Sequence, residues 1–236
     1  MWQGGEPALR RLVALAQLPG DRYVAAEKAV GCSRTVNEWK PWSFFAPAIP
    51  HPSSVRRPPS KEAIEAMLEA AAHAPDHGRL QPWRLILIEG DARRALGEIL
   101  AESFARRNPV AGDEALARER EKALRAPLIV VVATRCDRAA KIPVVEQFIA
   151  AGCAAHALML AAFAQGLGAF WRTGEAAYDE AVKAAFDIGS DDRIIGFIYV
   201  GIDTAGAPSR PRPVVHEFAQ RWTGASPRQA MPRRLE

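Results

Sequence analysis

Residues Leu128–Thr134, with the sequence LIVVVAT, decide the fold because they form the clearest strand pattern in the chain. The run is rich in β-branched residues and carries no charge, so we expect a strand that is buried on both faces. Two other short apolar runs, Trp83–Glu89 (WRLILIE) and Arg193–Gly201 (RIIGFIYVG), predict further core strands. Ala169–Arg172 is expected to form a short strand or a turn.

Helical patterns lie around these strands. Ser60 is expected to cap the first helix, whose apolar residues recur at helical spacing until Pro75 stops it. Three more helices are expected, from Asp91 through Phe104, over residues 144–167 and from Glu175 to Phe186. The alternation is irregular, and no G-x-G-x-x-G dinucleotide fingerprint follows a strand. We therefore predict a mixed central sheet flanked by helices.

The composition of the 236-residue chain is that of an ordinary soluble protein with a real core. Apolar residues make up 49% of the chain and charged residues 25%. The formal net charge is only +4, which does not argue for a nucleic-acid partner. An anionic small ligand would suit this charge equally well.

Cysteine usage and hydropathy indicate the compartment. The chain has 3 cysteines and no C-x-x-C pair, so neither a zinc site nor a disulfide framework is indicated. We expect a reducing, cytoplasmic setting. No stretch is expected to reach the roughly 20 apolar residues that span a bilayer, and the N-terminus lacks a signal pattern. These patterns predict a protein with no membrane partner.

The most informative segment for function is His73–Trp83, with the sequence HAPDHGRLQPW. It lies between a predicted helix end and a predicted strand start, where polar side chains can converge on a ligand. An exposed surface loop is one interpretation. A metal site on His73 and His77, as in a zinc hydrolase, is a second, but Pro75 disrupts the helix that would align both rings.

A third interpretation rests on resemblance. The segment resembles the A-P-D-H-x-x-x-Q-P-W motif of the nitroreductase-like FMN oxidoreductases, in particular their YdjA-type branch. Matching motifs follow in the same order, and the resemblance covers roughly residues 58 to 220. They are Arg125-Ala126-Pro127, Lys141-Ile142-Pro143, Glu146-Gln147, Ala151-Gly152-Cys153-Ala154, Ala164-Gln165-Gly166-Leu167-Gly168, Trp171-Arg172-Thr173-Gly174 and Ile195–Gly201.

The resemblance implies a nitroreductase-like α+β fold and an intertwined homodimer that binds two FMN molecules at its shared interface. Trp171, Arg172 and Thr173 match the family's W-R-[ST]-G cofactor segment. By the same resemblance, His73 and His77 reach the flavin that is held mainly by the other subunit. Gln81 is the expected partner of a polar edge of the isoalloxazine.

The implied activity is a hydride transfer from NADH or NADPH, through flavin N5, to a nitroaromatic, quinone or similar electron-poor small molecule. Because N5 itself accepts and delivers hydride, no protein residue is predicted to be catalytic, and ping-pong kinetics are expected. A cationic or N–H donor near the N1–C2=O edge of the flavin raises its reduction potential. Arg172 or His77 could supply that donor.

The N-terminal part departs from the family pattern. Relatives usually begin with an R-R-S-x-R-like segment that binds the FMN phosphate, but the equivalent ungapped residues 48–53 contain no arginine. Arg56 and Arg57, or Arg212 in the C-terminal part, could replace it. The alternative is a catalytically idle flavin-binding or interaction module that has lost this site.

These observations divide the chain into three parts. Residues 1–45 are expected to form an atypical N-terminal arm, residues 46–222 the nitroreductase-like FMN-binding domain, and residues 223–236 a C-terminal tail. The many prolines of residues 41–59 rule out a regular element there.

Overall fold

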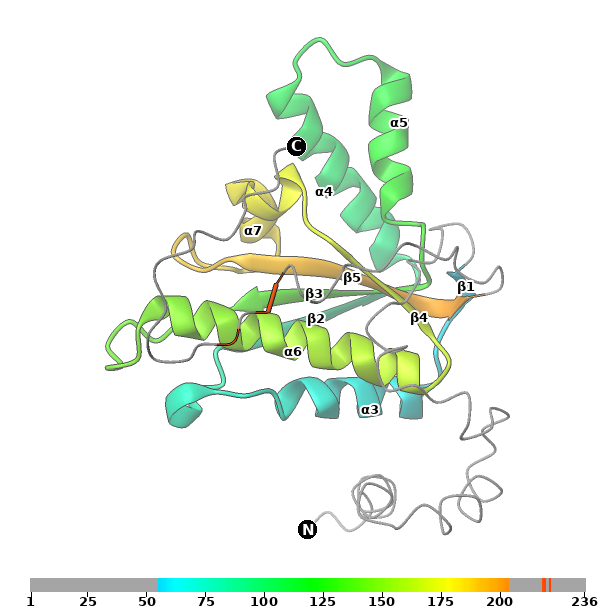
Figure 1. Cartoon of the computed structure of the whole chain (residues 1–236). Coiled ribbons are helices and arrows are strands. Elements are labelled where there is room, and N and C mark those ends of the chain that lie inside the picture. Colours follow the sequence, from blue (N-terminus) through cyan, green and yellow to red (C-terminus); the bar gives the residue numbers. More distant parts are fainter. Residues whose placement is uncertain (1–54, 204–217, 220, 222–236) are drawn as a thin grey trace, which may run out of the picture. The chain divides into compact units, whose positions relative to one another are not determined.

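The computed structural model describes residues 55–203, 218–219 and 221 (Figure 1). All of these residues belong to one unit, Ala46–Glu236. The predicted arm over residues 1–45, the tail over 223–236 and the candidate phosphate ligand Arg212 lie outside the described residues.

One five-stranded sheet forms the centre of the unit. Its strands are β1 (Val55–Arg57), β2 (Trp83–Glu89), β3 (Leu128–Thr134), β4 (Gly168–Arg172) and β5 (Ile194–Asp203). The order is β1-β5-β3-β2, and β4 also pairs with β5. The bounds predicted for β2 and β3 are confirmed, and Ala169–Arg172 forms a strand rather than a turn. The prediction that residues 41–59 hold no regular element is wrong, because Val55–Arg57 pair with β5 as the strand β1.

The predicted α+β class is confirmed, but the sheet is not mixed. Every strand pair within the described residues is antiparallel. The reason lies in the connection between β2 and β3, which is a hairpin of two helices, α4 (Ala92–Arg107) and α5 (Asp113–Lys122). These helices lead the chain away and back, as Figure 1 shows, so that it re-enters the sheet beside β2 in the opposite direction.

The central strand β3 confirms the prediction of burial on both faces, because all of its 7 residues are buried. Leu128, Val130 and Val132 pack into one core cluster. Ile129 and Val131 pack into a second cluster on the opposite face. Each such side chain contributes roughly 1.5–3 kcal/mol of hydrophobic stabilisation. The strand therefore joins the two cores of the unit.

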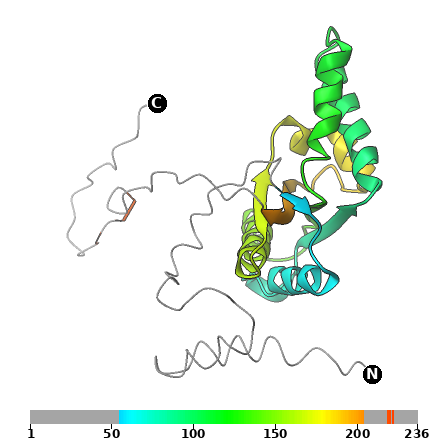
Figure 2. The same ribbon diagram turned by 90° about the vertical axis from the view of Figure 1, so that its right-hand side faces the viewer.

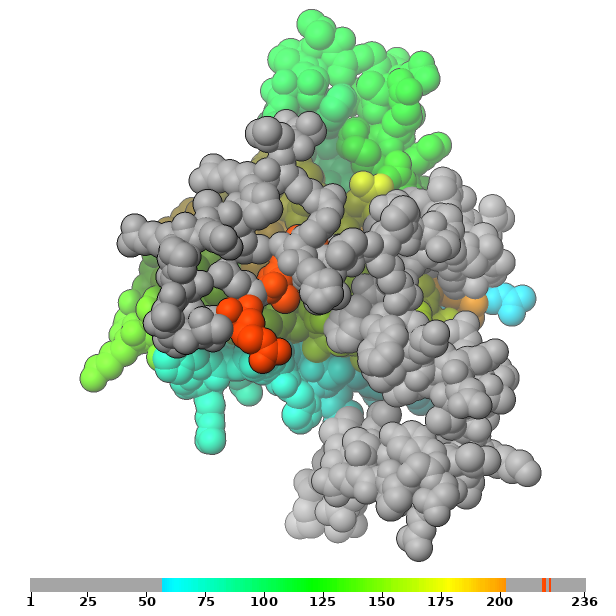
Figure 3. Space-filling view, in the orientation of Figure 1, coloured from blue at the N-terminus to red at the C-terminus, as the bar shows by residue number. Residues whose placement is uncertain are grey.

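Helices cover both faces of the sheet (Figures 1 and 2). One core cluster lies under α3 (Lys61–Ala72) and α6 (Val144–Ala164), and the other under α4 and α7 (Glu180–Ala185). Ser60 caps α3 as predicted, since its hydroxyl accepts a hydrogen bond from the Ala63 N–H at 3.2 Å. In the space-filling view of Figure 3 the α4–α5 hairpin and α3 occupy opposite ends of the visible face.

The helix predicted over residues 175–186 is interrupted. The structure has a 3₁₀ turn, η4 (Glu175–Tyr178), followed by the separate helix α7. The Asp179 carboxylate between them accepts hydrogen bonds from the Ala181 and Val182 N–H groups, which makes it the N-cap of α7. A capping side chain starts a helix and so ends the preceding turn.

The expectation that no segment is long and apolar enough to span a bilayer is wrong. Helix α6 has 21 residues and a mean hydropathy of 1.6 over its most apolar window. The core helix of a soluble protein can have the same length and hydropathy. One face of α6 packs on the sheet and α3, whereas Val145 and Ile149 near its start are each 60% exposed.

Candidate functional site

The histidine segment, residues His73–Trp83, has an uncommon backbone conformation between α3 and the start of β2. Gly78, Arg79 and Gln81 have φ angles of 82°, 57° and 49°, so three of four consecutive residues are left-handed. The non-glycine residues cost about 1–3 kcal/mol each in this conformation. The Asp76 carboxylate offsets part of that cost, because it accepts a hydrogen bond from the Gln81 N–H at 2.6 Å.

His77 pairs with a residue that lies far away in the sequence. Its Nδ1 is 2.5 Å from Oε2 of Glu146, which lies in the first turn of α6. The carboxylate can only accept, so Nδ1 donates and Nε2 is left for another partner. The side chains remain 65% and 40% exposed. The pair therefore orients an imidazole at the surface rather than burying a charge.

His73 is anchored in a similar way at the end of α3. Its Nδ1 is 2.8 Å from the Glu69 carbonyl oxygen, to which it donates, so Nε2 is again the free ring nitrogen. Within the residues that the structure describes, no group of three or more His, Cys, Asp or Glu side chains could hold a metal ion. Both histidines thus use Nδ1 in a hydrogen bond, to the Glu69 carbonyl oxygen and to the Glu146 carboxylate.

The loop before α6 packs against the histidine segment and is itself held by a buried glutamine. Gln147 is only 1% exposed, and its amide bonds the backbone N–H and C=O of Asp137 and the C=O of Ile142 at 2.8–3.1 Å. Ile142 in turn contacts Gly78 so closely that a Cβ there would lie 2.9 Å from its Cγ1. Gln147 is therefore part of the buried support of the histidine segment, whereas the side chain of its neighbour Glu146 is 40% exposed.

The W-R-T segment at the end of β4 divides between two faces of the sheet. The Trp171 indole packs against the core under α6 and donates from Nε1 to the Ile195 carbonyl oxygen at 3.1 Å. It lies so close to Gly196 that a Cβ there would be 2.2 Å from Nε1. Arg172 is exposed, with its guanidinium 4.5 Å from the centre of the Phe170 ring.

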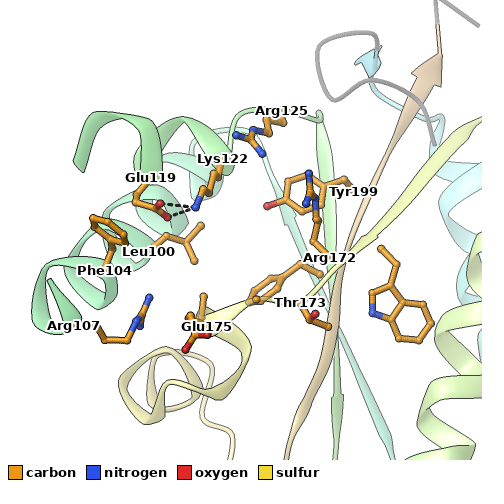
Figure 4. A pocket seen from close by; sticks show the side chains of 14 residues that line it. Leu100, Phe104, Arg107, Glu119, Lys122, Arg125, Arg172, Thr173, Glu175 and Tyr199 are labelled. Carbon is orange, nitrogen blue, oxygen red and sulfur yellow. Dashed lines mark hydrogen bonds and ion pairs between the residues drawn. The ribbon is translucent and has the colours of Figure 1, made fainter. Parts of the chain in front are cut away.

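Arg172 and Thr173 line a pocket of about 470 Å³ between the α4–α5 hairpin and strands β4 and β5 (Figure 4). The 14 lining residues combine apolar and charged groups. They are Leu100, Phe104, Arg107, Glu119, Lys122, Arg125, Trp171, Arg172, Thr173, Gly174, Glu175, Ala176, Phe197 and Tyr199. His73, His77 and Gln81 do not line it. Within one chain the predicted cofactor residues thus form two separate groups.

Three of the six charged residues that line this pocket, Arg107, Glu119 and Lys122, form ion pairs. Both Glu119 carboxylate oxygens accept hydrogen bonds from the Lys122 ammonium. Arg107 donates to the Asp179 carboxylate at 2.8 Å. Burial opposes ionisation of Asp179, but hydrogen bonds from Ser103 and the α7 N–H groups outweigh it and hold the pKa of this carboxyl below its usual value.

Arg56 and Arg57, the candidates for phosphate binding, lie in β1 at the edge of the sheet. Arg57 is paired with Ile202 near the end of β5, and its side chain is exposed. They lie on a different element from the histidine segment and from the W-R-T segment. Their role in binding a phosphate stays a prediction.

Sequence reasoning missed Arg125 and Tyr199 as pocket residues. Arg125 follows α5 and Tyr199 lies in the middle of β5. Two side chains of one pocket are therefore 74 residues apart in the sequence. Helix α5 was not expected either, because its sequence DEALAREREK has no buried residue and therefore no apolar periodicity. No local signal could have placed these residues together.

An antiparallel sheet with helices on both faces defines an α+β protein. Residues 55–202 match the model of the Nitroreductase family. The chain therefore belongs to the Nitroreductase family, as the resemblance predicted.

The similar proteins agree with this assignment. YdjA of Escherichia coli K12, which is named as a candidate NAD(P)H nitroreductase, is 37% identical over 143 residues, covering 61% of this chain and 77% of its own. A nitroreductase-like family protein from Bacillus cereus matches the fold with a TM-score of 0.67 at 20% identity, covering 82% of this chain and 100% of its own. A candidate nitroreductase from Desulfovibrio desulfuricans, solved in complex with FMN, matches with a TM-score of 0.56 at 25% identity, covering 76% of this chain and 95% of its own.

Proposed function

We propose that this protein is an FMN-dependent oxidoreductase that transfers hydride from NADH or NADPH to a small electron-poor acceptor, such as a nitroaromatic or a quinone. The observation that carries the proposal is the W-R-T-G segment, whose Arg172 and Thr173 lie at a pocket in a chain of the Nitroreductase family. The name of YdjA and the FMN complex of the Desulfovibrio protein support the same donor and cofactor.

The donor set fits a flavin. Arg172 offers an exposed cation and Thr173 a hydroxyl, while His77, His73 and Gln81 offer further polar side chains at the surface. Anchoring of Nδ1 in both histidines leaves each Nε2 available to a cofactor. Such donors are suited to the polar edge of an isoalloxazine, where a positive charge favours the reduced state.

The protein is proposed to act as an intertwined homodimer, because one chain holds the predicted cofactor residues in two groups. Val145 and Ile149 on α6 are each 60% exposed and flank Glu146, the partner of His77. A second copy that covers this apolar surface would bring its own W-R-T segment to the histidine segment of the first. Exposed apolar patches of this kind mark association surfaces.

Bound FMN would supply the redox chemistry, by accepting and releasing hydride at N5. The residues of the chain would bind and orient. Arg172 and His77 would place donors at the polar edge of the cofactor, and Gln81 would fix its orientation. No protein nucleophile or proton relay is required, so donor and acceptor would bind in turn, which gives ping-pong kinetics.

The phosphate of FMN is proposed to bind to Arg56 and Arg57 of β1 and to Arg212, within an FMN-binding domain over residues 46–222. Guanidinium groups suit this role because they donate bidentate, charge-assisted hydrogen bonds. Residues 1–45 and 223–236 are proposed to be an arm and a tail outside this domain, and the enzyme is proposed to work in the cytoplasm, without nucleic-acid or membrane partners.

The proposal is tested by the absorbance spectrum of the full chain after incubation with FMN and desalting. Flavin bands near one FMN per chain, which bleach on addition of NADH or NADPH, are the expected result. Arg172→Gln should lower FMN retention about tenfold, whereas Arg118→Gln, an exposed change on α5, should leave it unchanged.

A well-folded protein that stays colourless would overturn the proposed oxidoreductase function. It would favour the second candidate, a catalytically idle module of the same fold. The specific observation behind this alternative is that residues 48–53, at the ungapped position of the phosphate-binding arginines, contain none.

A further inference from the structure

The pocket under the α4–α5 hairpin contains a group of hydrogen-bond donors that form no ion pair with any described residue. Arg125, Arg172 and Tyr199 lie together at one end of the pocket, with Glu175 nearer to Arg107 (Figure 4). All three residues line the pocket, although they come from the segment after α5, from β4 and from β5.

These two arginines differ from the other cations of the pocket. Lys122 is neutralised by Glu119 and Arg107 by Asp179. Among the described residues Arg125 forms no ion pair, and the guanidinium of Arg172 contacts only the face of Phe170. This end of the pocket therefore carries a net positive charge, which favours an anionic group.

Apolar and aromatic side chains form another part of the pocket wall. Leu100 and Phe197 are 7% and 3% exposed, and Phe104 is half-buried beside them. A volume of about 470 Å³ is within the range of small-molecule sites. Flat apolar walls next to a cationic end match an aromatic ring that bears an acidic substituent.

We propose that this pocket binds small aromatic anions, with Arg125 and Tyr199 as ligands of the carboxylate or other acidic group. This extends the proposed function, on which it rests, by assigning the acceptor to the class of electron-poor aromatic acids. Arg125 is then the residue that selects for the charge of the acceptor, while Arg172 belongs both to this group and to the W-R-T segment.

The state of Tyr199 agrees with this role. Burial raises the pKa of its hydroxyl, the charge of Glu119 raises it further, and the two arginines only partly oppose these effects. The hydroxyl therefore stays protonated at neutral pH and can donate a hydrogen bond to an anion. Among the described residues it has no hydrogen-bond partner of its own.

The test is calorimetric titration of the full chain with 4-nitrobenzoate and with its neutral analogue 4-nitrobenzamide, each with and without added FMN. The benzoate should bind about tenfold more tightly than the amide, because a hydrogen bond to a charged group is worth more than a neutral one. Arg125→Gln should remove about this tenfold preference, and Tyr199→Phe a smaller part of it. Arg118→Gln serves as the matched arginine control on the same hairpin.

Equal binding of benzoate and amide, or an unchanged preference in Arg125→Gln with a native circular dichroism spectrum, would overturn the proposal. Adenosine 2′-phosphate is titrated in parallel, since a nucleotide phosphate shares the chemistry of an anion. Displacement of nitrobenzoate by it at lower concentration would overturn the aromatic-acid assignment in favour of a nucleotide. A colourless protein that still prefers nitrobenzoate would retain the pocket assignment and reject only the reductase.

Discussion

The histidine segment and the pocket under the α4–α5 hairpin are built in opposite ways. The histidine segment is a single stretch of chain whose residues are visible together in the sequence, and its support is a short buried network around Gln147. The pocket is assembled from α4, α5, β4 and β5 and exists only when these four elements are folded together. A local motif can thus be recognised in the sequence, whereas the selectivity of a site depends on contacts between distant elements.

The largest effect on stability is expected where β4 and β5 lie in close contact at one wall of the pocket. Gly196→Ala places a Cβ about 2.2 Å from Trp171 Nε1, which must displace the indole and break its hydrogen bond to Ile195. We expect the free energy of unfolding to fall by about 3 kcal/mol in urea denaturation. Gly152→Ala on α6, where nothing lies within 4 Å, is the control and should not destabilise the chain. Equal effects of both changes would contradict the close approach of Trp171.

A second prediction concerns Asp179, which caps α7 and pairs with Arg107 of the pocket. Asp179→Ala should lower the free energy of unfolding by about 2 kcal/mol at pH 7, since it removes both a cap and an ion pair. The folded pKa of this carboxyl lies below the ordinary value of 3.8, so its contribution is present above pH 3.8 and disappears as the pH falls through the folded pKa. The difference in unfolding free energy between wild type and variant should therefore shrink in acid. A difference that stays constant down to pH 2 would argue against the charged pairing.

The histidine segment should respond to its buried support. Gln147→Leu leaves the N–H of Asp137 and two carbonyl groups without their partner, which costs about 1–3 kcal/mol. Hydrogen exchange should accelerate in residues 137–142 and in the adjoining histidine segment through the Ile142–Gly78 contact. Exchange in β4 and β5 around the pocket should stay unchanged. Acceleration in both regions would show that the two are not independent.

The smallest effect on stability is expected at the exposed ion pair of His77 and Glu146. Glu146→Gln should change the free energy of unfolding by less than about 1 kcal/mol, because exposed pairs are strongly screened. FMN affinity should nevertheless fall about threefold, since the carboxylate fixes which ring nitrogen of His77 is presented. Glu65→Gln on α3 is the matched exposed control. An equal FMN affinity of both variants would exclude a positioning role for Glu146.

Much of the fold could be predicted from local patterns. The strands β2 and β3 were predicted to the residue, and the Ser60 cap of α3 was correct, because apolar runs and capping chemistry are properties of neighbouring residues. The antiparallel pairing and the charged helix α5 were not predicted. Strand direction depends on the path of a connection, and a fully solvated helix has no apolar stripe to reveal it.

The sequence by itself determined which groups this protein offers: the histidine segment, the W-R-T-G segment and the buried strands that identify the Nitroreductase family. Only the tertiary structure decided their partners, because hydrogen bonds and ion pairs act over a few ångströms and ignore distance along the chain. It paired His77 with Glu146, 69 positions away, and placed Arg125 beside Tyr199. The arrangement of Arg125, Arg172 and Tyr199, which no motif shows, distinguishes the cationic end of the pocket from an ordinary surface between helix and sheet.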